Sequence, residues 1–253
     1  MKFVHDTHLL VQRKVRETLR QPVWVVMGLA TPLLYLALFA PLLDKLREGP
    51  GFRGASTLDV FIPGVLCLMA FGAGMGAGWG VIFELQAGVI ERFRVTPVSR
   101  FALVLGTAIR DVLAFLIPAV IVIFVALPFN YHPDRIGTVI LLVLLSLVAA
   151  GTSAWSSALG VTLREIGSLA AVVTGLQLPL TLLAGILLPL SLAPAWLRGL
   201  AHIDPLYYTV RAARLLSVGT LGNSTVAVGF LVSGVLTVVM LAWATRAYNR
   251  AMT

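Results

Sequence analysis

The chain has 253 residues, of which 58% are hydrophobic and 12% are charged, and its formal net charge is +8. Soluble domains contain about 45–50% apolar and about 25% charged residues, so this composition excludes an ordinary soluble domain and indicates a polytopic membrane protein. At roughly 20 apolar residues per span, the length allows about six spans. The single cysteine, Cys67, excludes a disulfide framework and a thiolate metal site. We attribute the positive charge to membrane topology and expect no nucleic-acid partner.

An amphipathic pattern marks residues 1–21. Apolar residues fall on one helical face: Val4, Val11, Val15 and Leu19. Arginines fall on another: Arg13, Arg16 and Arg20. We expect a helix in the headgroup layer of the lipid bilayer, with its arginines directed to lipid phosphates. The alternative is a plain, positively charged anchor on the inner side.

The first two predicted spans are residues 23–43 and 60–83, joined by a polar external loop. The second span is unusual because five glycines alternate with other residues and give three overlapping pairs of small residues four apart: Gly72, Gly74, Gly76, Gly78 and Gly80. Gly72, Gly76 and Gly80 are the candidate packing or hinge residues. Glycines let helix backbones approach closely in lipid, and they also weaken a helix. They therefore indicate either static helix packing or a hinge that bends during transport.

The charged segment 84–100, ELQAGVIERFRVTPVSR, separates two long apolar runs and must lie outside the bilayer. Its apolar residues Leu85, Val89 and Phe93 are spaced for one helical face, and Pro97 ends the pattern. Glu84 and Glu91 share another face. We expect a helix on the cytoplasmic surface whose charged side is available to a partner protein.

Three further spans are predicted, separated by short turns: 112–127, 138–162 and 167–190. Arg110 and Asp111 precede the first of them, and we expect both at the inner interface. Arg164 and Glu165 indicate a tight inner turn with a helix-capping role.

The section 191–222 is too polar for a span and is interpreted as an interfacial or re-entrant hairpin on the outer side. Asp204 and Pro205 are typical of a helix start, and Gly219 of a helix end, which predicts a helix over 205–217. It carries three candidate functional side chains: Tyr207, Arg211 and Arg214. The last span is predicted at 224–245. Lys and Arg residues are more frequent in the predicted inner segments when both termini are cytoplasmic, which favours that orientation.

Several kinds of chemistry are absent from the sequence. No Gly-Lys pair is present, so there is no phosphate-binding loop, and no metalloprotease or serine-hydrolase motif occurs. We therefore expect no catalytic residue and no metal site. Acidic residues fall at the predicted ends of spans, whereas an ion-coupled transporter usually keeps one at depth. These absences favour a translocation component that a partner drives.

Two motifs then resemble a known family. The residues Glu84, Gly88, Glu91, Arg92, Phe93, Arg94, Thr96, Pro97 and Arg100 resemble the signature of type-2 ATP-binding-cassette exporter permeases, most closely the daunorubicin-resistance-type drug-efflux subunits. The segment from Asp204 to Val210 is similar to that family's Asn-Pro-x-x-Tyr segment. Asp204 replaces the usual asparagine, and Arg211 stands where an acidic residue is common.

The resemblance implies one permease domain over residues 1–253, in a bacterial cell membrane, with six spans and cytoplasmic termini. It implies a homodimer, or a pair of similar permeases, with two separate ATPase subunits that bind ATP and Mg. Residues 84–94 would form the coupling helix, and spans one, two and five would line an apolar substrate path.

The implied function is export of hydrophobic drugs or natural products. Export of a lipid or a lipid-linked glycan is an alternative within the class. An ion-coupled secondary transporter and a membrane scaffold or sensor without transport are alternatives from other classes.

Overall fold

The computed structural model describes residues 2–19, 28–38, 57–89, 99–129, 131–186 and 193–252. Within these ranges the chain is helical and contains no strand, which confirms the predicted all-α fold. Five helical segments are long and apolar enough to cross a membrane: Leu58–Gln86, Arg100–Phe129, Arg135–Leu163, Ile166–Leu183 and Ser224–Ala251. A shorter apolar helix, Gly28–Leu38, lies within the predicted first span.

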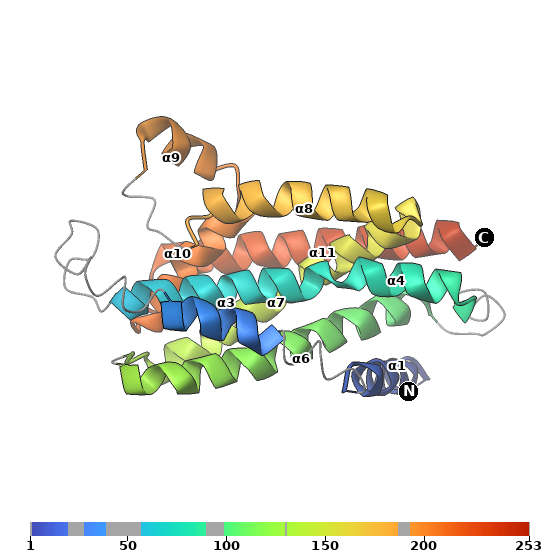
Figure 1. Ribbon diagram of the computed structural model, residues 1–253, viewed down its shortest axis with the longest axis horizontal. Coiled ribbons are helices and arrows are strands. Elements are labelled where there is room, and N and C mark those ends of the chain that lie inside the picture. The colour runs from blue at the N-terminus through green and yellow to red at the C-terminus, as the bar shows by residue number, and fades with distance from the viewer. Residues whose placement is uncertain are drawn as a thin grey trace.

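The helices form one elongated bundle, with both chain ends toward the same end of it (Figure 1). The labelled helices are α1 (Lys2–Leu19), α3 (Thr57–Met75), α4 (Ala77–Gln86), α6 (Arg100–Ala126) with the short η1 (Leu127–Phe129), α7 (Arg135–Leu163), α8 (Ile166–Leu183), α9 (Ala195–Ala201), α10 (Pro205–Ser217) and α11 (Ser224–Met252). We call the end that holds the termini the inner end, and the end that holds α9 and α10 the outer end.

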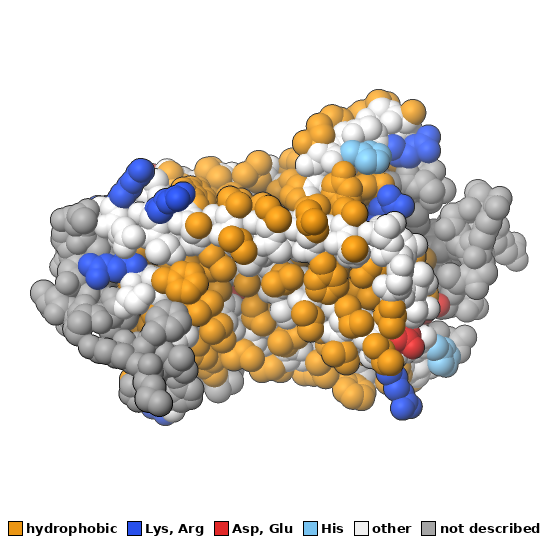
Figure 2. Space-filling view, turned by 180° about the vertical axis from the view of Figure 1, so that it is seen from behind, with side chains coloured by type: hydrophobic (Ala, Val, Ile, Leu, Met, Phe, Trp, Pro, Cys, Tyr) orange, Lys and Arg blue, Asp and Glu red, His pale blue; other side chains and the backbone are white. Residues whose placement is uncertain are grey.

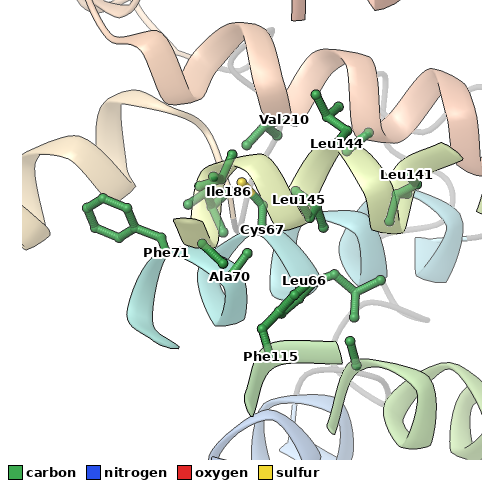
Figure 3. Packing of buried hydrophobic residues seen from close by; sticks show 14 of the residues in the cluster. Leu66, Cys67, Ala70, Phe71, Phe115, Leu141, Leu144, Leu145, Ile186 and Val210 are labelled. Carbon is green, nitrogen blue, oxygen red and sulfur yellow. The ribbon is translucent and has the colours of Figure 1, made fainter. Parts of the chain in front are cut away.

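Helix α7 is the centre of the bundle, because α3, α4, α6, α10 and α11 all pack on it. The outer half of the core joins α3, α6, α7 and α10 through side chains such as Cys67, Phe115, Leu144 and Val210 (Figure 3). A separate apolar cluster at the inner half includes Val81, Val161 and Tyr248. Burial of such side chains stabilises the packing between helices through close van der Waals contact.

Apolar side chains also cover the outside of the bundle. Figure 2 shows them across the middle of one long face, with Lys and Arg side chains toward the ends. The most exposed of these side chains on the spans include Phe124 of α6, Val139 of α7 and Leu231 of α11. An apolar belt between two charged ends matches the profile of a bilayer, which agrees with the predicted polytopic membrane protein.

Helix α1 packs across the inner part of α6. A Cβ atom added at Gly106 would lie 3.1 Å from the Leu10 side chain, so α1 approaches α6 closely at this point. Its length agrees with the predicted interfacial helix.

The third span begins at Arg100, twelve residues before the predicted start at Val112. The prediction ended the span at the charges of Arg110 and Asp111, which the structure instead accommodates inside the helix. Pro118 also lies inside α6 without ending it. The fifth span ends at Leu183, before the predicted residue 190, and the last helix continues past residue 245 to Met252.

Helix α10 has the predicted bounds. Asp204 caps its N-terminus by accepting a hydrogen bond of 2.9 Å from the Leu206 N–H, and Pro205 follows at the first helical position. Gly219, with φ +80°, ends it. Rather than lying on the surface, α10 packs against α3, α7 and α11.

Candidate functional site

The second span is broken at Gly76, between α3 and α4. A break frees backbone groups that a continuous helix would pair. Ser156 of α7 binds two of them, because its hydroxyl donates to the Met75 carbonyl oxygen at 2.5 Å and accepts from the Gly78 N–H at 2.9 Å. The break in the second span is therefore stabilised by a specific contact with α7.

The glycines of the second span divide into two groups. Gly74 and Gly78 face α7, where a Cβ atom at Gly78 would lie 2.5 Å from the Ser156 carbonyl oxygen. On α7, Gly160 approaches the Gly78 backbone equally closely. Of the residues predicted for packing or for a hinge, Gly72, Gly76 and Gly80 make no such contact: a Cβ atom at Gly72 or Gly80 would have no described neighbour within 4 Å, and one at Gly76 only the Ala73 carbonyl oxygen at 3.8 Å. Gly76 lies at the break between α3 and α4, and the hinge stays a prediction. The close packing belongs to the other face of the helix.

An ion-pair cluster lies at the inner end of the second span. Lys14 Nζ lies 2.7 Å and Arg13 Nη2 3.5 Å from the Glu84 carboxylate. A small pocket beside it is lined by Leu103, Thr107 and Tyr248, among others. Glu84 therefore binds α1 of its own chain, which contradicts the prediction that its charge is free for a partner. Arg13 faces this carboxylate rather than lipid alone, whereas Arg16 is exposed.

The predicted coupling helix does not begin at Glu84, because α4 ends at Gln86 and Gly88 adopts φ +66°. A left-handed glycine ends a helix, so Leu85 and Val89 do not lie on one continuous helix. Residues 90–98 fall outside the described ranges, and with them the predicted coupling residues Glu91, Arg92, Phe93, Arg94 and Pro97. Arg20, predicted at the membrane surface, lies outside them too.

Asp111 is buried inside α6, with 2% of its surface exposed, rather than at the interface as predicted. Ser153 of α7 donates a hydrogen bond to its Oδ2 atom, and Arg110 Nε lies 2.9 Å from its Oδ1 atom. The charge of Asp111 is thus compensated within the helix bundle. An acidic residue therefore lies within a span, contrary to the expectation that acidic residues fall only at the ends of spans.

At the outer end, the structure separates the three predicted side chains of α10. Arg211 is exposed and donates to the Tyr207 hydroxyl at 3.1 Å, with its guanidinium 5.5 Å from the ring centroid. Asp204 is 3% exposed, and its Oδ2 atom has no hydrogen-bond partner among the described residues. Burial raises the pKa of the Asp204 carboxyl to about 6, against the opposing effect of the hydrogen bond from Leu206.

Arg214 points into the bundle. It donates from Nε to the Val60 carbonyl oxygen at 3.2 Å, and from Nη2 to those of Gly185 and Ile186 at 2.7 and 3.2 Å. Burial lowers the pKa of the Arg214 guanidinium to about 10, so it stays charged at neutral pH. One side chain thus joins α10 to α3 and to the chain that leaves α8.

Sequence reasoning missed the polar residues of α7 that hold the second and third spans, Ser153 and Ser156. A signal for them exists, because Ser153, Ser156 and Gly160 recur at helical spacing in span four and form a small-residue stripe. The same spacing is also typical of ordinary helix packing, so it does not show by itself which helix this stripe contacts.

Comparison with known proteins agrees with this architecture. The family model described as "ABC-2 type transporter" matches residues 5–218. The chain is 30% identical over 217 residues to "Putative transport permease ycf38" of Cyanophora paradoxa, covering 85% of this chain and 74% of the relative.

Two bacterial relatives are similar over most of their length. "Daunorubicin resistance ABC transporter permease protein DrrB1" of Streptomyces coeruleorubidus is 24% identical over 232 residues, covering 90% of this chain and 80% of the relative. "Inner membrane transport permease YadH" of Escherichia coli K12 is 26% identical over 235 residues, covering 87% of each chain. The family model spans most of the sequence, and the resemblance seen in its motifs is thereby confirmed: the chain belongs to the ABC-2 type transporter family of membrane permeases.

Proposed function

We propose that this permease is the membrane subunit of a bacterial exporter for hydrophobic or amphipathic drugs or natural products. A separate ATPase, in two copies, would bind ATP and Mg and drive the cycle from the inner side, where α4 ends at Gln86. Membership of the ABC-2 family supports the ATP-driven class. Similarity to DrrB1, whose name states daunorubicin resistance, supports an amphipathic drug as the substrate class.

The observation that carries the proposal is an apolar face of the second span, which the helix Gly28–Leu38 covers in its outer half and which has no close described neighbour in its inner half. In the outer half, Phe61 and Val65 of α3 pack with Tyr35 of the helix Gly28–Leu38. Farther in, the same side of the span presents Gly72, Gly76 and Gly80, which have no close partner among the described residues. None of these residues is charged, so the surface suits an apolar partner or substrate.

Span five supplies a second surface of the same kind. Helix α8 contacts α4, yet few of its residues are buried, and its outer half exposes Leu178 and Leu182. A second copy of the permease would cover both surfaces, because open glycine faces favour close helix association in lipid. The substrate path would then run between the two copies, along spans one, two and five.

The proposed orientation has both termini in the cytoplasm. Arg13 and Lys14 of α1, Arg246 and Arg250 of α11, and the Arg164 turn carry positive charge on the cytoplasmic side in this arrangement. This orientation agrees with the rule that Lys and Arg are more frequent on the cytoplasmic side of membrane proteins.

The test of the exporter is isolation of the tagged permease from native membranes, followed by ATPase assays of the reconstituted complex with and without amphipathic drugs. We expect an ATPase subunit in one-to-one ratio with the permease, and turnover that the drugs stimulate. A lone permease that moves the drugs down a proton or sodium gradient would refute the proposal.

The homodimer is tested by cross-linking. A Gly76→Cys substitution in a Cys67→Ala background places one thiol on the open glycine face. We expect oxidation to link two permeases there. The matched control is Leu231→Cys on the exposed face of α11, which should remain monomeric. Equal cross-linking at both positions would argue against the glycine face as the dimer contact.

A further inference from the structure

Span five is attached to the rest of the chain mainly near its two ends. Within α8 itself only Leu169 and Val173, toward the inner end, are buried. In its outer half Leu176, Leu178 and Leu182 are exposed, and Leu180 is partly buried against the core. After α8 the chain turns at Gly185, with φ +67°, and buries Ile186 in the core. Apart from the contact of Leu180, the position of the outer half of α8 therefore depends on this turn.

Arg214 holds that turn in place through hydrogen bonds. Carbonyl groups at the end of a helix lack intrahelical donors. Arg214 Nη2 supplies a donor to the carbonyl oxygens of Gly185 and Ile186, while its Nε binds the Val60 carbonyl oxygen of α3. The end of span five is thus tied to span two through one guanidinium on α10.

Beneath these hydrogen bonds, α3 and the turn after α8 are in close contact. A Cβ atom at Gly64 of α3 would collide with the Ile186 carbonyl oxygen, so the two backbones are in direct contact. Figure 3 shows Cys67, one turn farther along α3, beside Ile186 and Val210. Cys67 has no exposed surface and is the only cysteine in the chain. Separation of the turn from α3 would expose it to water.

The hydrogen bonds of Arg214 are suited to a contact that opens and closes. Charge-assisted bonds from a guanidinium hold the closed arrangement more strongly than neutral ones. Among the described residues, Arg214 donates to backbone carbonyl oxygens and to no carboxylate, so opening leaves no buried carboxylate there without its counter-ion. Water at the outer end can solvate the guanidinium and the carbonyls once they part.

We propose that Arg214 is the outer latch of this permease: it holds the end of span five against span two while the permease is closed to the outside, and it releases that end when the permease opens outward. Arg214 is a positioning residue and need not touch the substrate. The inference rests on the proposed export cycle, because it assigns a role to one step of it.

The test measures how fast N-ethylmaleimide modifies Cys67 in the complex of permease and ATPase, reconstituted in lipid. A thiol reacts as its thiolate, so modification reports access of water. Without nucleotide, the wild-type thiol should react slowly, and ATP with orthovanadate should accelerate it. Arg214→Met should accelerate modification without nucleotide by roughly tenfold or more, the equilibrium shift expected for lost charge-assisted bonds.

Two variants bracket this result. Arg214→Lys keeps the charge but loses the planar set of N–H donors, so modification should proceed at an intermediate rate. If Arg214→Met does not accumulate in the membrane, the rate for Arg214→Lys is the measurement that tests the proposal. Arg211→Met removes an exposed arginine from the same helix and should leave the rate unchanged.

A reporter elsewhere distinguishes a latch from general loosening. Val161 of α7 is buried in the inner cluster, and Val161→Cys in a Cys67→Ala background places a slightly smaller side chain there. Its thiol should stay protected when Arg214→Met is added. Modification of both positions, or of neither, would overturn the latch. Exposure of Cys67 by Arg214→Met without any effect of ATP on the wild type would support the latch and refute the ATP-driven cycle instead.

Discussion

Lys14 and Glu84 form an ion pair of 2.7 Å that joins the N-terminal helix to the last turn of the second span. Their side chains are 13% and 17% exposed, so water and salt screen this pair less than one on the surface. The pair therefore holds the inner end of α4 to α1.

A charge reversal tests this link. Glu84→Lys places like charges together and should destabilise the permease by about 1–2 kcal/mol, as expected for a partly buried pair. Lys14→Glu with Glu84→Lys restores opposite charges and should recover most of the loss in thermal unfolding of the purified permease. No recovery in the double variant would mean that Glu84 acts mainly through another group.

Ser156 should be important for stability. Ser156→Ala leaves the Met75 carbonyl and the Gly78 N–H without their partner at the break in the second span, at a cost of about 1–3 kcal/mol. The neighbouring Ser157 is also buried, but its hydroxyl has no hydrogen-bond partner among the described residues. Ser157→Ala is therefore a matched control that should be nearly neutral. A similar loss in both variants would contradict the assigned role.

Glycines in contact should differ from glycines on an open face. Gly78→Ala would place its Cβ atom 2.5 Å from the Ser156 carbonyl oxygen, which forces α4 and α7 apart and should cost about 1–3 kcal/mol. Gly234 lies on α11 with nothing described within 4 Å of an added Cβ atom. Gly234→Ala should be neutral or stabilising by up to about 1 kcal/mol, because alanine favours helix. Thermal unfolding of the two variants in the same detergent makes the comparison.

Asp204 should make stability depend on pH. Its pKa of about 6 lies above the ordinary value of 3.8, so the folded state retains a proton that the unfolded state has lost. The stability contributed by the protonated carboxyl is present at low pH and is lost as the pH rises through about 6. Asp204→Asn keeps the cap acceptor without the charge, so its stability relative to wild type should rise by about 1 kcal/mol between pH 5 and pH 8. A difference that is the same at both pH values would contradict this.

The sequence was sufficient for the elements whose signals are local. Asp204, Pro205 and Gly219 set the ends of α10 through capping and backbone preference, and these predicted bounds are confirmed. The apolar runs likewise predicted the class of the fold, because a membrane imposes a minimum length of apolar helix.

Features that depend on a second helix were not predictable in the same way. An isolated charge is costly in lipid, so the sequence alone predicts Asp111 at the interface, whereas Ser153 and Arg110 compensate its charge inside the bundle. The alternating glycines of the second span give pairs on two faces, and spacing alone does not say that the pair Gly74 and Gly78, rather than Gly72, Gly76 and Gly80, meets α7. The sequence predicts a single helix from Glu84 onward, but Gly88 interrupts it by adopting φ +66°. Glycine permits this conformation without requiring it, so the residue type alone does not predict the turn.

The central place of α7 has a consequence for how the protein is made. A nascent chain is delivered from its N-terminus, so α3 and α4 are synthesised before the helix on which they pack. Before α7 is inserted, the Met75 carbonyl and the Gly78 N–H lack the Ser156 hydroxyl as a hydrogen-bond partner. Gly74 and Gly78 likewise lack the helix against which they pack. The second span thus matures only after the fourth has been inserted, and a chain that stops short of α7 should be recognised by membrane quality control as incomplete.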